Sequence, residues 1–171
     1  VVQIYAGLRD EELRAAAARY VNKYVQPRVF AEMAALVGAL IHAGVEIWAV
    51  SSTNKWVVAE GVRDLGIPEE RILAAEVRVV AGLITTEILD VPTDEGKAAA
   101  LARVGLTCPD AVFGNSVHDL AMLQMARNAF PVNPSPALLE AAAKNGWGYF
   151  QPEAAEDGEA AVGGESPTSG S

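Results

Sequence analysis

Apolar side chains recur at intervals of three and four residues between positions 29 and 43, and this spacing predicts a helix with one apolar face. The apolar positions are Phe30, Met33, Leu36, Val37, Leu40 and Ile41. Residues 9–24 predict an earlier helix, because acidic residues occupy its first turn and alanine dominates its middle. Pro27 should end the earlier helix and Gly44 the later one.

The pattern then changes to an apolar run over residues 45–50, which predicts a buried strand. The polar residues 51–54 follow as helix-capping residues, and a helix should run to about Leu65 and stop at Gly66. Residues 73–89 predict a hairpin in which Ala81 and Gly82 form the turn.

The remaining pattern alternates between helices and short strands. It predicts helices over residues 95–104, 117–127 and 135–144, and strands over 110–113, 129–132 and 147–150. Alternation with short connections implies a parallel sheet flanked by helices, that is, an α/β, Rossmann-like doubly wound fold. In such sheets ligands bind beyond the carboxyl ends of the strands, where Ser51 and Asn115 should both lie.

Charge and composition narrow the classes of partner. The net charge of −9 and the absence of a basic stripe argue against binding of nucleic acid. No apolar run reaches the roughly 18 residues that a membrane-spanning helix requires, so no membrane partner is expected. Residues 152–171 are acidic and poor in large apolar side chains, which predicts a disordered tail.

Three polar positions suit the binding of a phosphoryl group. Ser51, at the end of a predicted strand, can donate its hydroxyl to an anionic oxygen, and the helix that follows adds backbone N–H groups. Lys97, at a predicted helix start, brings a full positive charge. Asp119 can hold Mg²⁺ directly or through water. Taken one at a time, these residues also suit purely structural roles. Ser51 could cap a helix, Lys97 could be a solvated helix residue, and Asp119 could be an acid in the first turn of a helix.

The segment from about Phe30 to Phe150 resembles the haloacid dehalogenase superfamily of phosphohydrolases, in its phosphoserine-phosphatase-like branch. The resemblance rests on Val50-Ser51 after an apolar strand and on Glu95-Gly96-Lys97 at a helix start. It rests also on the run Gly114-Asn115-Ser116-Val117-His118-Asp119 and on the predicted hairpin.

The resemblance implies a role for each matching position. Ser51 would bind the transferring phosphoryl group, with Ser52 and Asn54 beside it, and Lys97 would pair with the nucleophile and the phosphate. Asn115 and Asp119 would hold Mg²⁺, with Asn115 standing where the family has an acid. The substrate would be a small phosphorylated molecule, and Ser51, Lys97 and Asp119 would form the catalytic set.

The family's first motif, Asp-x-Asp-x-Thr, does not occur in these 171 residues. The resemblance therefore predicts three parts: residues 1–27 as a remnant of a helical cap, 28–151 as an incomplete core, and the tail. A missing N-terminal segment, or a second chain, would carry the nucleophilic aspartate, and without it we expect no phosphatase turnover.

Two other functions stay open on the sequence alone. Asn115 and the absent nucleophile favour a non-catalytic module that binds phosphate or a protein partner. A receiver domain of the response-regulator kind also places Asp, Ser/Thr and Lys around Mg²⁺. It would need an acceptor aspartate after an earlier strand, which this sequence lacks, and the hairpin does not suit it.

Overall fold

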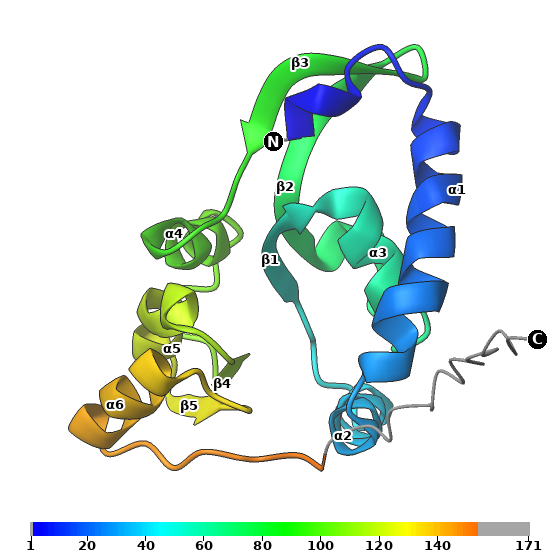
Figure 1. Ribbon diagram of the computed structural model, residues 1–171. Helices are drawn as coiled ribbons and strands as arrows, with labels where there is room; N and C mark the ends of the chain where they lie inside the picture. Colours follow the sequence, from blue (N-terminus) through cyan, green and yellow to red (C-terminus); the bar gives the residue numbers. More distant parts are fainter. Residues whose placement is uncertain (1, 154–171) are drawn as a thin grey trace, which may run out of the picture.

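The computed structural model describes residues 2–153 and begins with helices (Figure 1). A short 3₁₀ turn, Val2–Tyr5, precedes α1 (Asp10–Tyr20), which continues through a π-helical turn to Val25 and a 3₁₀ turn, Gln26–Arg28. Helix α2 (Ala31–His42) follows, and Gly44 closes it with a φ of 79°. Both predicted N-terminal helices are confirmed.

A three-stranded sheet holds the middle of the chain. Strand β1 (Ala49–Asn54) pairs in parallel with β2 (Ile72–Val80), and β2 pairs antiparallel with β3 (Leu83–Asp90). Helix α3 (Lys55–Arg63) connects β1 to β2 through a 3₁₀ turn, Glu69–Arg71. The hairpin prediction is confirmed, and its turn residues Ala81 and Gly82 both have positive φ, as a tight two-residue hairpin turn requires.

The predicted bounds of β1 were wrong. The strand begins at Ala49 rather than at residue 45, and it continues to Asn54, so Ser51 lies inside the strand instead of capping a helix. Only Asn54 caps α3: its side-chain oxygen accepts the N–H of Val57 at 3.0 Å. β1 pairs with β2 at Val50 and again at Asn54, with an irregular register between them, so residues 51–53 lie between two paired positions and continue the strand instead of starting a helix.

A second, two-stranded sheet forms from the C-terminal part of the described chain. Its strands β4 (Ala111–Gly114) and β5 (Asn128–Pro131) are parallel and in register. The helices of this part are α4 (Glu95–Arg103), α5 (Leu120–Met125), which a 3₁₀ turn over Val117–Asp119 precedes, and α6 (Pro136–Asn145). The strand predicted over residues 147–150 is reduced to one parallel bridge, between Val132 and Phe150.

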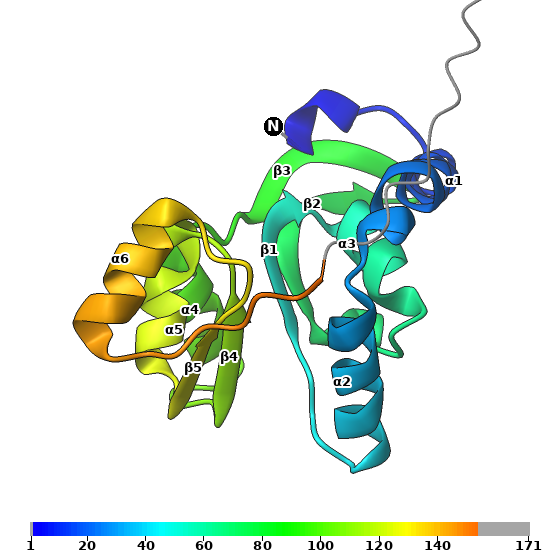
Figure 2. The same ribbon diagram turned by 60° about the horizontal axis from the view of Figure 1, so that its bottom comes forward.

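The two sheets stand apart, whereas the alternation of elements predicted one. Strand β1 hydrogen-bonds only to β2, and β4 only to β5, among the strands of residues 2–153. Figures 1 and 2 show α4, α5 and α6 grouped with β4 and β5, and α1 and α3 grouped with β1–β3. No described strand joins the two groups. The mixed α/β, Rossmann-like fold class is nevertheless confirmed.

Each sheet has its own apolar core. The first core consists of Val2, Ala17, Trp56, Ala75, Val77 and Ile84, and the second of Leu101, Val112, Met122, Leu123 and Leu138. Trp56 ties the N-terminus to the first core, because its ring packs edge-on against Tyr5 and its Nε1–H donates to Asp10 at 2.7 Å. Val50 of β1 and Leu73 of β2 also pack against the second cluster, so side chains connect the two sheets although no described strand does.

Three further predictions concern the C-terminal tail, the division of the chain into parts, and membrane-spanning helices. Most of the predicted disordered tail, residues 154–171, lies outside the described residues. The proposed division at residues 27 and 151 stays a prediction. Within residues 2–153 no single helix is long and apolar enough to cross a membrane; residues 10–28 and α2, bent by 105°, pass that test only as a pair.

The two adjacent leucines of α6 provide a test of the second core. Leu138 is fully buried and Leu139 is 41% exposed. We expect Leu138→Ala to lower the free energy of unfolding by about 3 kcal/mol, through lost burial and a residual cavity. Leu139→Ala should cost less than about 1 kcal/mol. Urea denaturation of both variants measures the difference, and equal losses would contradict this description of the core.

Candidate functional site

A buried ion pair forms the centre of the candidate site. The Lys97 Nζ atom, from the first turn of α4, lies 2.5 Å from the Asp119 Oδ1 atom, in the turn that follows β4. Their side chains are only 10% and 7% exposed. Among the described residues these are the two buried charged groups. Because charges are rarely buried unless paired, each holds the other in place.

The loop between β4 and α5 wraps around the Asp119 carboxylate. The Oδ2 atom accepts the backbone N–H groups of Asn115 and Ser116, at 3.0 and 3.1 Å, and lies 3.4 Å from the Ser116 hydroxyl. A Cβ atom at Gly114 would lie 2.7 Å from the Asp119 Cβ, closer than real contacts allow. Glycine at 114 is therefore a condition for this loop.

These contacts lower the pKa of Asp119 below its usual 3.8. Burial acts most strongly and opposes ionisation, but the hydrogen bonds from Lys97 and from the Ser116 and Asn115 N–H groups, with the attraction of the ammonium, outweigh it. Asp119 is thus a carboxylate across the neutral range. It keeps a full negative charge beside the Lys97 ammonium.

A second, exposed pair links the same two segments, and the sequence did not reveal it. The His118 Nδ1 atom lies 2.7 Å from the Asp94 Oδ1 atom, and Thr93 contacts the other carboxylate oxygen at 3.2 Å. Asp94 has a φ of 47°, an uncommon backbone conformation for a residue with a side chain. The hydrogen bond from His118 is the main cause that lowers the pKa of Asp94.

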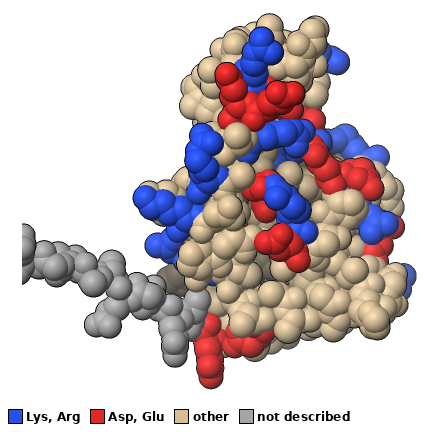
Figure 3. Space-filling view, turned by 90° about the vertical axis from the view of Figure 1, so that its right-hand side faces the viewer, with Lys and Arg blue, Asp and Glu red and all other residues tan. Residues whose placement is uncertain are grey.

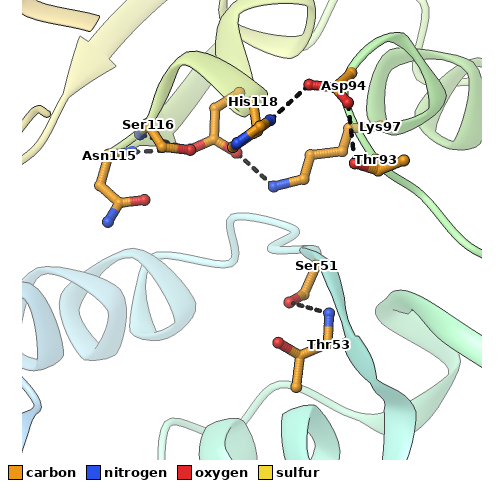
Figure 4. Close-up of polar contacts among 9 residues, drawn as sticks. Ser51, Thr53, Thr93, Asp94, Lys97, Asn115, Ser116 and His118 are labelled. Atoms are coloured by element: carbon orange, nitrogen blue, oxygen red, sulfur yellow. Dashed lines mark hydrogen bonds and ion pairs between the residues drawn. The ribbon is translucent and has the colours of Figure 1, made fainter. Parts of the chain in front are cut away.

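Ser51 lies across from this cluster on the other sheet, and Figure 4 shows its hydroxyl turned toward Thr53. Figure 4 shows Lys97 and Asn115 directed toward the side on which Ser51 lies. The Ser51 hydroxyl oxygen accepts the Thr53 N–H at 3.1 Å, which leaves its hydrogen available to a ligand. Binding of one phosphoryl group by Ser51, Lys97 and Asp119 together stays a prediction. Helix α3 starts at Lys55, four residues beyond Ser51, so the helix does not begin at the serine as the sequence suggested.

Two other predicted phosphate-binding residues have different surroundings. Ser52 is exposed and lies in the part of β1 where the register with β2 is irregular. Asn54 uses its side-chain oxygen to cap α3, which leaves only its amide N–H groups for a ligand. Phosphate binding by these residues stays a prediction.

The residues predicted to hold Mg²⁺ supply only part of a metal site. No group of three or more His, Cys, Asp and Glu residues suited to a metal occurs within residues 2–153. Both Asp119 oxygens already accept hydrogen bonds. Asn115 is exposed and contributes one amide oxygen, a type of ligand that Mg²⁺ accepts together with waters and substrate oxygens. A further carboxylate would have to come from elsewhere.

The family model for haloacid dehalogenase-like hydrolases matches residues 1–124, which include β1, the start of α4 and the Asp119 loop. The chain belongs to this family. The match extends further toward the N-terminus than the resemblance did, since it includes residues 1–27, and it ends within α5.

Several known proteins are similar to this chain in sequence or in structure. A probable phosphatase of Mycobacterium tuberculosis is 29% identical over 149 residues, which cover 83% of this chain. The chain spans about half (50%) of that relative's length. A protein of unknown function from Bordetella pertussis Tohama I is similar in structure, with a TM-score of 0.72, 26% identity, and coverage of 83% and 67% of the two chains. A phosphoserine phosphatase in its apo form shares the fold, with a TM-score of 0.58, 19% identity, and coverage of 90% and 72%.

The ion pair predicts a pH-dependent cost of removing Lys97. Lys97→Met leaves the Asp119 charge buried and unpaired, which should lower the free energy of unfolding by about 3 kcal/mol at pH 7. The natural pair stabilises the fold above pH 3.8, and that contribution is lost as the pH falls through the lowered pKa of Asp119. In the variant, burial without the ammonium raises that pKa, so the difference should shrink as the pH falls from about 5 to 3.

Lys55 offers a matched control for this measurement. Its Nζ atom lies 3.1 Å from Glu76 Oε1, but the two side chains are 23% and 36% exposed. We expect Lys55→Met to cost less than about 1 kcal/mol. Denaturant titrations of both variants between pH 7 and 3 give the comparison. A loss for Lys97→Met no greater than for Lys55→Met would contradict the burial described for the pair.

Proposed function

We propose that this chain forms part of a Mg²⁺-dependent phosphomonoesterase that acts on a small phosphorylated metabolite through an aspartyl-phosphate. The observation that carries the proposal is the buried Lys97 ammonium, held by Asp119 on the side that faces Ser51. Family membership and the relative described as a probable phosphatase support it. The nucleophilic aspartate would come from a segment outside these 171 residues.

Lys97 would supply the fixed positive charge. An ammonium has three N–H donors, and Asp119 accepts one of them. The other donors would contact the attacking carboxylate and a phosphoryl oxygen, where negative charge gathers during transfer. Because Asp119 is already ionised and bound by its loop, the lysine needs no reorganisation when a phosphate arrives.

Ser51 would hold a second phosphoryl oxygen through its hydroxyl, from the opposite side of the site. The attacking carboxylate oxygen forms a bond to phosphorus while the bond from phosphorus to the substrate oxygen breaks. A water then hydrolyses the acyl phosphate, releases inorganic phosphate and restores the carboxylate. Mg²⁺, held in part by Asn115, would neutralise phosphoryl charge during both steps.

The first test uses a chain extended at its N-terminus by a segment that carries Asp-x-Asp-x-Thr. We expect this extended chain, with Mg²⁺, to hydrolyse p-nitrophenyl phosphate. Ser51→Ala should lower kcat/KM by roughly 10²-fold, through loss of one transition-state donor. Thr107→Ala removes an exposed hydroxyl just before β4 and should leave the rate unchanged. Equal rates for Ser51→Ala and the parent would contradict the role of Ser51.

A second prediction concerns the metal. Asn115→Asp replaces an amide oxygen by a charged carboxylate, so the extended chain should reach half-maximal activity at a Mg²⁺ concentration roughly tenfold lower. Magnesium titrations of the two rates measure this shift. The same dependence on Mg²⁺ in both chains would exclude Asn115 as a ligand.

Asn115 also favours a second function, a non-catalytic module that binds phosphate. An amide in place of an acid weakens a metal site but leaves Lys97 and Ser51 able to hold an anion. Under this alternative the extended chain would bind orthovanadate or phosphate in calorimetry, and Lys97→Met would abolish binding. It would show no turnover at any Mg²⁺ concentration.

A further inference from the structure

The turn that begins α4 has an unusual backbone at Asp94, the residue directly before the helix. Its φ of 47° and ψ of −121° lie in a region that residues other than glycine rarely enter. Lys97 follows in the first turn of α4, and its N–H donates to the carbonyl oxygen of Asp94 at 3.1 Å. The strained residue is thus bonded directly to the backbone of the lysine at the centre of the site.

The Asp94 side chain does not cap the helix that it precedes. Aspartate is among the preferred N-cap residues, because its carboxylate can accept N–H groups of the first turn. Asn54 and Ser135, which precede α3 and α6, cap those helices in this way, whereas Asp94 makes no such bond. Its carboxylate instead contacts the His118 ring and the Thr93 hydroxyl (Figure 4). Figure 3 shows charges of both signs over much of the surface, so one more exposed ion pair is not unusual in itself.

The contact with His118 does not by itself explain this arrangement. The His118 and Asp94 side chains are 64% and 51% exposed, and exposed ion pairs contribute little to stability. A strained backbone and a forgone helix cap together cost more than such a pair contributes. Strained conformations persist where the surrounding structure imposes them, and they are concentrated at functional sites. The benefit of this one must therefore lie in what the turn positions.

Two contacts join the same two segments of the chain. Asp94 and Lys97 lie three residues apart, about one helical turn, and their partners His118 and Asp119 are adjacent in the loop before α5. The buried contact fixes the ammonium of Lys97. The exposed contact fixes Asp94, to which the backbone of Lys97 is bonded. Both ends of a long and flexible side chain are thereby held in place.

We propose that Asp94 and His118 are positioning residues for Lys97. By holding the turn before α4 in its strained conformation, the pair sets the direction from which the lysine stem enters the site. The ammonium then lies on the side where Ser51 lies (Figure 4), with two N–H donors that Asp119 does not accept. Without the pair, Asp94 would relax and cap α4, and the backbone of Lys97 would lose its fixed position. In this role neither residue of the pair touches the reacting atoms.

The effect on turnover rests on the proposed function, but the effect on the position of Lys97 does not. That position can be measured in the 171-residue chain by two signals. The first is the ¹⁵N resonance of the Lys97 ammonium in a chain labelled at lysine, assigned by its loss in Lys97→Arg, which keeps a cation in the buried pair. The second is hydrogen exchange at the Lys97 amide, whose N–H is bonded to Asp94.

Two substitutions at His118 test the contact itself. We expect His118→Ala to shift the Lys97 ammonium resonance and to speed exchange of the Lys97 amide by about tenfold or more, because the turn is released. His118→Asn should keep the parent signals, since its side-chain nitrogen is attached to Cγ, as Nδ1 of histidine is, and can donate to Asp94. Glu87→Ala is the control. It breaks a hairpin pair with Arg78 of similar exposure, 55% and 51%, and should change neither signal.

Asp94→Gly separates positioning from stability. Glycine adopts positive φ without strain, so this variant should be at least as stable as the parent in urea denaturation. It lacks the carboxylate, however, so the Lys97 signals should change as they do in His118→Ala. A loss of stability would contradict the strain on which the proposal rests. Parent signals for Lys97 in the folded Asp94→Gly and His118→Ala chains would overturn the proposal.

Kinetics of the extended chain separate this inference from the proposed function. Asp94→Gly and His118→Ala should lower kcat for p-nitrophenyl phosphate roughly tenfold with little change in KM, because a misplaced Lys97 stabilises the transition state less. His118→Asn should keep the parent rate. If the Lys97 signals change as expected but the extended parent is inactive with Mg²⁺, the positioning of Lys97 stands and the phosphatase proposal fails. If the extended parent is active and kcat does not fall in the two variants, the phosphatase proposal stands and the positioning role fails.

Discussion

The buried pair of Lys97 and Asp119 is the constraint on which the site depends. Two charges at 10% and 7% exposure are tolerated only because they meet each other and because backbone N–H groups of the β4–α5 loop satisfy the carboxylate. That requirement fixes glycine at 114, where a Cβ atom would collide with Asp119. One electrostatic contact therefore determines the loop's path, the direction of the lysine and the neighbouring Asn115.

The Lys97–Asp119 pair is one of two contacts that hold α4 to the loop after β4. Both carboxylate oxygens of Asp119 accept hydrogen bonds, one from Lys97 and the other from the N–H groups of its own loop. The exposed Asp94–His118 pair repeats the connection at the surface, between the segments that carry Lys97 and Asp119. Two ties of different burial thus hold α4 to the loop after β4. Ser51 lies on the other sheet, where its neighbour Val50 packs against the second apolar cluster.

The sequence predicted the elements whose signals are local. The hairpin followed from Ala81-Gly82 between apolar runs, and the helices followed from apolar spacing and end signals. The sequence did not predict features that depend on a residue or strand far away along the chain. Pairing of Val50 and of Asn54 with β2 carries β1 past Ser51, and a single bridge at Phe150 replaces the last predicted strand. The Asp94–His118 contact joins exposed residues 24 positions apart, and neither residue type signals a partner at that range.

The conflict between pattern and structure at α2 is itself informative. Its apolar spacing predicts a helix that packs on a core, and the helix forms as predicted, but none of its residues is buried. Phe113 and Phe130, register partners on β4 and β5, show the same mismatch at 37% and 43% exposure. Apolar residues at regular spacing normally pack against other apolar side chains, and residues 2–153 supply too few of them at α2 and on this face of β4 and β5.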